Sequence, residues 1–121
     1  MGKSIASKFT ESALRTLPKG NIKTTTTHCL FGILTEAGEL TDIFKRKQFY
    51  GKEIEISHVK EEVGDILWYL SNLSITYGFT LEEAMVKNER KLRVRYPDKF
   101  TKKLALNRRL NEEMKVIKNE M

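Results

Sequence analysis

The sequence predicts an all-α fold, a helical bundle of four to five helices. Three observations lead to this prediction. Only two prolines and seven glycines interrupt the 121 residues, apolar side chains recur at helical spacing, and signals for helix starts and stops separate the segments. A chain of this length is enough for one domain with a modest core.

The first two predicted helices are separated by a break at Pro18–Gly20. The first covers about residues 5–17 and stops there, because proline and glycine end helices. The second covers about residues 26–47. The stretch QFYGKEIEI follows it as a connection, with Gly51 as the turn residue.

The third and fourth predicted helices carry recognisable caps. Ser57 can cap a helix over about residues 58–77, which Gly78 then stops. A capping box, TLEE at residues 80–83, starts a fourth helix that ends before Pro97. The second and third helices are apolar on more than one face, through Phe31 and Leu34 among others. We therefore expect a core that is shared between subunits.

A fifth predicted helix forms a basic tail over residues 101–121, after a main domain over residues 1–100. Residues 1–89 carry a net charge of −1, whereas residues 90–121 carry +7. Such a tail could meet phosphates, nucleic acid or an acidic partner, or it could be a solvated helical face. An apolar stripe favours docking onto the bundle or a partner subunit over nucleic-acid binding, with Lys102, Lys103, Arg108 and Arg109 left to solvent. The stripe consists of Leu106, Leu110, Met114, Ile117 and Met121.

The composition predicts a cytoplasmic protein outside the membrane. The single Cys29 cannot form an internal disulfide, and no secretory signal is visible at the start of the sequence. No apolar run approaches the length that spans a bilayer.

Two pairs of acidic residues interrupt the apolar faces of the second and third helices. Glu36 and Glu39 are spaced i, i+3, and Glu62 and Asp65 repeat that spacing, so each pair shares one helix face. If the two helices pack together, four carboxylates meet in a partly desolvated place. They must then protonate or find cations.

A hard divalent metal satisfies this cluster better than a salt-bridge network. Neither apolar stripe carries a Lys or Arg between its acids, and all-oxygen ligand sets suit Mg²⁺ or Mn²⁺. A carboxylate-bridged di-iron site is disfavoured because neither His28 nor His58 stands in a Glu-x-x-His pattern.

Together these segments resemble a known family. EAGEL followed by EEVGDILWYL resembles the MazG-like nucleoside triphosphate pyrophosphohydrolases, whose signature is Glu-x-x-Glu, a spacer, then Glu-x-x-Asp. KNERKLRVRYPDKF, at residues 87–100, is similar to the closing segment of that family, and KQFYGKEI to the connection of small phage-type members. The resemblance covers about residues 28–100 and identifies residues 1–100 as a MazG-like domain.

The resemblance implies hydrolysis of a nucleoside triphosphate between its α- and β-phosphates. Mg²⁺, for which Mn²⁺ can substitute, would be held by Glu36, Glu39, Glu62 and Asp65. One carboxylate would act as general base, with Glu39 favoured and Glu36 as the alternative. The candidate substrate-binding residues, which the pattern alone would leave as ordinary surface groups, are Lys45, Asn88, Lys91 and Arg95.

The resemblance also implies a homodimer or homotetramer, and dNTPs or non-standard NTPs as substrates. Two alternatives stay open. One is phosphoribosyl-ATP pyrophosphohydrolase, which has the same chemistry. The other is a non-catalytic helical module that binds nucleic acid or protein through the basic tail, and salt-sensitive binding without pyrophosphate release would distinguish it.

Overall fold

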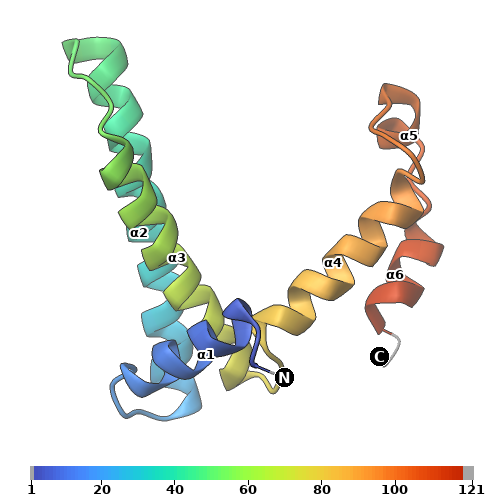
Figure 1. Cartoon of the computed structure of the whole chain (residues 1–121), viewed down its shortest axis with the longest axis horizontal. Helices are drawn as coiled ribbons and strands as arrows, with labels where there is room; N and C mark the ends of the chain where they lie inside the picture. Colours follow the sequence, from blue (N-terminus) through green and yellow to red (C-terminus); the bar gives the residue numbers. More distant parts are fainter. Residues whose placement is uncertain (1, 119–121) are drawn as a thin grey trace. The chain divides into compact units, whose positions relative to one another are not determined.

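A computed structural model describes residues 2–118, and within them every regular element is a helix (Figure 1). The helices are α1 (Ile5–Arg15), α2 (Ile22–Tyr50), α3 (Ile56–Thr76), α4 (Leu81–Arg95), α5 (Lys102–Leu106) and α6 (Leu110–Lys118). The all-α prediction is confirmed. None of these helices is both long enough and apolar enough to cross a membrane. The chain forms two compact units, Met1–Leu81 and Glu82–Met121.

The first unit is built on a hairpin of two long antiparallel helices, α2 and α3, which lie side by side (Figure 1). Helix α2 begins four residues earlier than the sequence predicts because Asn21 caps it. The Asn21 side chain accepts a hydrogen bond from Thr24 N at 2.9 Å, and Thr24 Oγ1 accepts one from Asn21 N at 3.1 Å. Gly51, with φ of 67°, ends the helix in the left-handed conformation that glycine adopts without strain.

Helix α1 is fixed to α3 by polar side chains. Asn72, which is buried, donates from Nδ2 to Ala13 O at 3.1 Å. One turn earlier on α3, Trp68 Nε1 donates to Thr16 Oγ1 at 2.8 Å. The first contact satisfies a buried donor that would be costly to leave without a partner. Both contacts attach α1 to the stretch of α3 that follows the predicted acid pair.

The second unit contains α4, α5 and α6, and the tail is not the single helix that the sequence predicts. Asn107 ends α5, since both its backbone N and its side-chain Nδ2 donate to Lys103 O. Asn competes in this way with the helical hydrogen bonds, so a new helix starts only at Leu110. The predicted stripe residue Met121 lies outside the described residues.

Helix α6 is held in the second unit mainly through a charged residue. Glu113, whose side chain is 3% exposed, lies within 2.7 Å of Arg95 and 2.8 Å of Arg108. Leu110 and Met114, from the predicted apolar stripe, are by contrast exposed. The four tail cations expected in solvent, Lys102, Lys103, Arg108 and Arg109, are all exposed, and Arg108 is also bound to Glu113. Ile117, also from the stripe, is half-buried, so the stripe contributes less than Glu113 to holding α6 in this unit.

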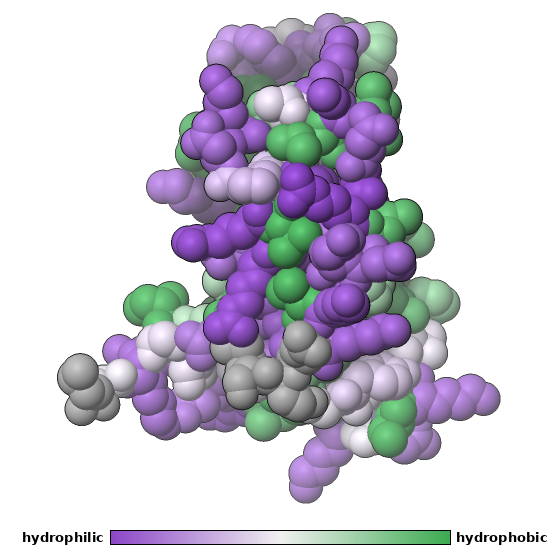
Figure 2. Space-filling model, turned by 90° about the vertical axis from the view of Figure 1, so that its right-hand side faces the viewer, coloured by the Kyte–Doolittle hydropathy of each residue, from purple (hydrophilic) through white to green (hydrophobic). Residues whose placement is uncertain are grey.

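Much apolar surface of the first unit remains uncovered. Among the described residues only Ala13 and Cys29 are hydrophobic and fully buried, whereas Phe31 and Leu34 on α2 are 67% and 73% exposed. In the second unit, too, single apolar side chains reach the surface among hydrophilic ones, on the face that Figure 2 draws. Exposed patches of this kind mark interaction surfaces, and we propose that a second copy of the chain covers Phe31 and Leu34.

We expect a mass in solution of at least twice 14.1 kDa. Leu34→Lys places a charge on the proposed contact and should shift the protein toward monomer at micromolar concentration. Leu34→Met keeps the apolar volume and serves as the control. Light scattering coupled to size exclusion measures the outcome, and a wild-type monomer would contradict the prediction.

Candidate functional site

Three carboxylates meet where α2 packs on α3. Glu36 comes from α2, and Glu62 and Asp65 come from α3; one oxygen of each lies within 4.8 Å of the others. The i, i+3 spacing places Glu62 and Asp65 on one face of α3, and the antiparallel hairpin brings Glu36 opposite them. The sequence-based expectation that the two acid pairs face each other therefore holds for these three residues.

Glu39, the fourth predicted ligand, lies beside this cluster without joining it. Its side chain is exposed, and its carboxylate is not among the three that lie within 4.8 Å of one another. It is nevertheless near enough for its negative charge to contribute to the raised pKa of Glu36. The helical spacing alone predicted all four together and did not separate Glu39 from the other three.

The environment of Glu36 disfavours its charged form. Its pKa is raised to about 7, first because Glu62 accepts a hydrogen bond from the protonated acid, then because of desolvation, and then because of the negative charges of Glu39, Glu62 and Asp65. In the described part of the chain, Oε2 of Glu36 and Oε2 of Glu62 are buried and have no hydrogen-bond partner. Such buried oxygens require a proton or a cation.

The donor set of this cluster fits a hard divalent cation. All of its ligand atoms are carboxylate oxygens, which Mg²⁺ and Mn²⁺ prefer, whereas softer metals favour nitrogen or sulfur. The two unpartnered Oε2 atoms provide coordination sites that no protein group uses. Glu36, Glu62 and Asp65 are therefore the residues that could hold a metal.

An aromatic wall borders the carboxylates. A cavity of about 320 Å³ is lined by Glu36, Asp65, Trp68 and Tyr69. Burial raises the pKa of the Tyr69 hydroxyl, and the charges of Glu36 and Asp65 raise it further. The sequence alone did not distinguish Trp68 and Tyr69 from ordinary core side chains. Their positions three and four residues after Asp65 could have indicated that both rings share a face of α3 with that carboxylate.

A glycine lets Tyr69 approach α2 closely. A Cβ added at Gly32 would lie 2.1 Å from Tyr69 Cε1, so a larger residue would displace the ring. His28, one turn before Gly32, contacts Trp68 and Tyr69 edge to face, with ring centroids 6.1 and 5.6 Å apart. These contacts fix the rings beside the acids.

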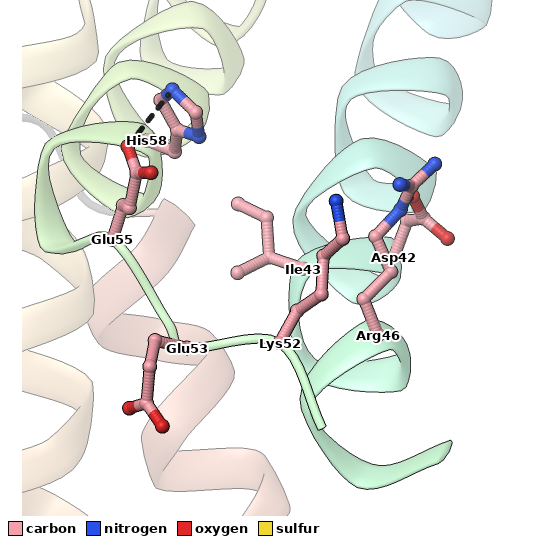
Figure 3. A pocket seen from close by; sticks show the side chains of 7 residues that line it. All are labelled: Asp42, Ile43, Arg46, Lys52, Glu53, Glu55 and His58. Carbon is pink, nitrogen blue, oxygen red and sulfur yellow. Dashed lines mark hydrogen bonds and ion pairs between the residues drawn. The ribbon is translucent and has the colours of Figure 1, made fainter. Parts of the chain in front are cut away.

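A second cavity, of about 300 Å³, lies at the turn of the hairpin (Figure 3). Within it, Arg46 Nε lies 2.7 Å from Asp42 Oδ2, and His58 Nε2 lies 3.5 Å from Glu55 Oε2. Lys45, a predicted substrate-binding residue, lies 3.6 Å from Asp42 and is about half exposed. The full lining is Asp42, Ile43, Arg46, Lys52, Glu53, Glu55 and His58.

The remaining predicted substrate-binding residues lie on α4, in the second unit. Asn88 is exposed and Lys91 is half-buried. Arg95, one turn after Lys91, has a side chain that is only 16% exposed because its guanidinium is bound to Glu113. The helical spacing of Lys91 and Arg95 was evident in the sequence, whereas the contact between Arg95 and the tail was not.

We expect the stability of the metal-free protein to fall as pH rises from about 4.5 to about 7. Glu36 has a pKa of about 7 in the folded state and an ordinary value of 4.5. Between these values the folded protein therefore binds more protons than the unfolded chain, so stability decreases with pH. Melting temperatures measured with a chelator should show this decline.

Glu36→Gln should flatten the decline in that window, because the titrating group is removed. Glu61→Gln changes a neighbouring exposed acid outside the cluster and should keep the wild-type slope. Parallel curves for wild type and Glu36→Gln would contradict the assignment of the titration to Glu36.

Comparison with known protein families gives a match over more than half of the chain. A family profile described as "MazG nucleotide pyrophosphohydrolase domain" matches residues 24–100. This segment includes Glu36, Glu62 and Asp65 and ends before α5. No curated protein and no solved structure matches the chain.

Proposed function

The chain belongs to the MazG nucleotide pyrophosphohydrolase family, and we propose that it hydrolyses a nucleoside triphosphate between the α- and β-phosphates, with Mg²⁺ as its cofactor. The products are a nucleoside monophosphate and pyrophosphate. The observation that supports this reaction most directly is the cluster of Glu36, Glu62 and Asp65 within 4.8 Å. Its unpartnered buried oxygens match a metal that binds phosphates.

In this proposal Glu36, Glu62 and Asp65 hold the cation. The bound metal supplies Lewis acidity and lowers the pKa of a coordinated water. Glu36 must give up its proton before it can act as an anionic ligand near pH 7, because its pKa is raised to about 7. Binding at this cluster should therefore release a proton and strengthen as pH rises.

Glu39 is the proposed general base. It lies beside the three ligands and remains exposed, so its carboxylate can accept a proton from an attacking water without leaving a metal site. A base needs hydrogen-bond reach to that water, and the charge contribution of Glu39 to the pKa of Glu36 supports its proximity to the cluster.

The substrate is proposed to lie with its sugar or base against Trp68 and Tyr69. Ligand cavities combine apolar walls with a few polar groups, and the cavity of about 320 Å³ has two rings beside two carboxylates. Lys45, Asn88, Lys91 and Arg95 remain the proposed phosphate and sugar ligands. They would offset phosphate charge beyond what the metal neutralises.

A panel of dNTPs, ribonucleoside triphosphates, non-standard NTPs and phosphoribosyl-ATP, assayed with Mg²⁺, tests the activity directly. We expect equal amounts of monophosphate and pyrophosphate from at least one nucleoside triphosphate. Release of single phosphates, or no turnover together with salt-sensitive nucleic-acid binding, would contradict the proposed reaction.

Asp65→Asn and Glu39→Gln should each lower kcat by about 100-fold or more, since each removes a charge that the chemistry uses and each factor of ten costs ~1.4 kcal/mol. Glu61→Gln, the same type of change on α3 outside the cluster, should retain activity close to wild type. Near wild-type pyrophosphate release from Asp65→Asn would remove the acid cluster from the reaction.

Millimolar Mg²⁺ or Mn²⁺ should raise the melting temperature above that measured with a chelator, because the cation binds only the folded site. The rise should be absent in Asp65→Asn and present in Glu61→Gln. Superimposable wild-type melting curves with Mg²⁺ and with chelator would show that the carboxylates are satisfied without metal.

A further inference from the structure

Two arginines of the second unit converge on one carboxylate oxygen. Arg95 Nη2 and Arg108 Nη2 donate to Glu113 Oε1 at 2.7 and 2.8 Å. Arg95 Nε also donates to Oε1 at 3.2 Å and to Oε2 at 3.3 Å. Two guanidiniums around one oxyanion form the arrangement that binds phosphate as well as carboxylate.

Glu113 is enclosed in this contact. Its side chain is 3% exposed, and the two guanidiniums lower its pKa to about 2. Glu113 therefore stays ionised at neutral pH, and in this conformation its carboxylate fills the space between Arg95 and Arg108. Arg95 itself is largely buried, whereas Arg108 is 42% exposed, so the site has one side open to solvent.

The contact joins the family domain to the chain's own extension. Arg95 lies inside the matched residues 24–100, whereas Arg108 and Glu113 lie beyond them. Helix α6 keeps Leu110 and Met114 exposed, at 59% and 49%, whereas Val116 and Ile117 are half-buried, so its release uncovers only part of one apolar face. Another described contact of α6 is Ile117 O, which accepts from Lys87 Nζ at 2.9 Å. Ionic contacts of this kind can be exchanged for a competing anion.

We propose that Arg95 and Arg108 form a phosphate-binding site, and that Glu113 is an internal carboxylate that occupies it until a phosphate group displaces it. The ligand is the phosphate chain of a nucleoside triphosphate or free pyrophosphate. The identity of this ligand rests on the proposed function. A doubly charged phosphate group offers the two arginines more acceptor oxygens than one carboxylate does. In this proposal α6 is displaced when the phosphate group binds.

Occupation by Glu113 lowers the apparent affinity for phosphate. A ligand that needs the open state binds with its intrinsic affinity multiplied by the fraction of protein in that state. Glu113→Gln replaces the charge with a neutral amide of the same size. It leaves two positive groups without their anion, so it should bind phosphate more tightly than wild type.

Calorimetric titration of the full chain with inorganic pyrophosphate, in the presence of a chelator, tests the proposal. We expect Glu113→Gln to bind pyrophosphate about tenfold more tightly than wild type. Adding Arg108→Gln should abolish this gain. Adding Arg109→Gln, the same loss of charge at an adjacent exposed residue, should leave the gain in place.

Equal affinity of wild type and Glu113→Gln for both pyrophosphate and ATP would overturn the proposal. Equal losses from Arg108→Gln and Arg109→Gln would overturn it too, since the effect would then be general electrostatics. If Glu113→Gln melts at lower temperature, pyrophosphate should restore its melting temperature more than it raises that of wild type. A failure to do so would show that Glu113 has a structural role only.

A parallel titration with ATP, also in chelator, identifies the source of the phosphate. A gain for pyrophosphate assigns the site to the phosphate chain itself, and a gain for ATP alone assigns it to the nucleotide.

Failure here is separable from failure of the proposed function. Nucleotide hydrolysis by wild type with Mg²⁺ would stand even if Glu113→Gln bound pyrophosphate no better. Conversely, tighter pyrophosphate binding in chelator does not depend on turnover.

Discussion

Repulsion between carboxylates is the constraint on which the first unit depends. Two ionised groups about 4.8 Å apart repel by about 3 kcal/mol at an effective dielectric constant of 20, and three acids approach one another this closely. The hairpin of α2 and α3 holds them together, and the hydrogen bonds from Asn72 and Trp68 fix α1 to the same region of α3. Without a metal, the raised pKa of Glu36 lets a bound proton reduce this repulsion. Membership of the MazG family favours a divalent cation as the group that reduces it instead.

The two units use charge in opposite ways. In the first, like charges are brought together and left without protein partners, as at Oε2 of Glu36 and Glu62. In the second, Glu113 lies between two arginines, and its pKa falls instead of rising. Titratable groups perturbed by like charges cluster at functional sites, whereas the charge of Glu113 already has its partners within the protein. In the described part of the chain, the acid cluster is thus where a proton or a cation from solution is needed most.

Local patterns were sufficient to predict much of the fold. The break residues and the apolar spacing predicted α1 to α4 within a few residues. The cap at Asn21 was missed, so α2 begins earlier. The predicted cap at Ser57 was wrong, because α3 begins at Ile56 with Glu55 at its N-cap. The i, i+3 acid pairs predicted the meeting of Glu36, Glu62 and Asp65, since helix geometry fixes which side chains share a face. The sequence could not place Glu39 outside that group, nor pair Arg95 with Glu113 eighteen residues later. Those outcomes depend on how elements pack and not on spacing within one element.

The close approach of Tyr69 to α2 at Gly32 affects how α2 and α3 align along their axes. Gly32 lies one turn before Glu36, and Tyr69 lies one turn after Asp65, so the ring that lies against Gly32 sets the sliding position of α2 along α3. A slip by one helical turn would move Glu36 by about 5.4 Å, which exceeds the spread of the three carboxylate oxygens. The missing side chain at Gly32 thus helps to fix the relative position of the carboxylates of Glu36, Glu62 and Asp65. Gly32 does so without contacting the acids, because the Tyr69 ring fits against α2 in only one alignment of the two helices.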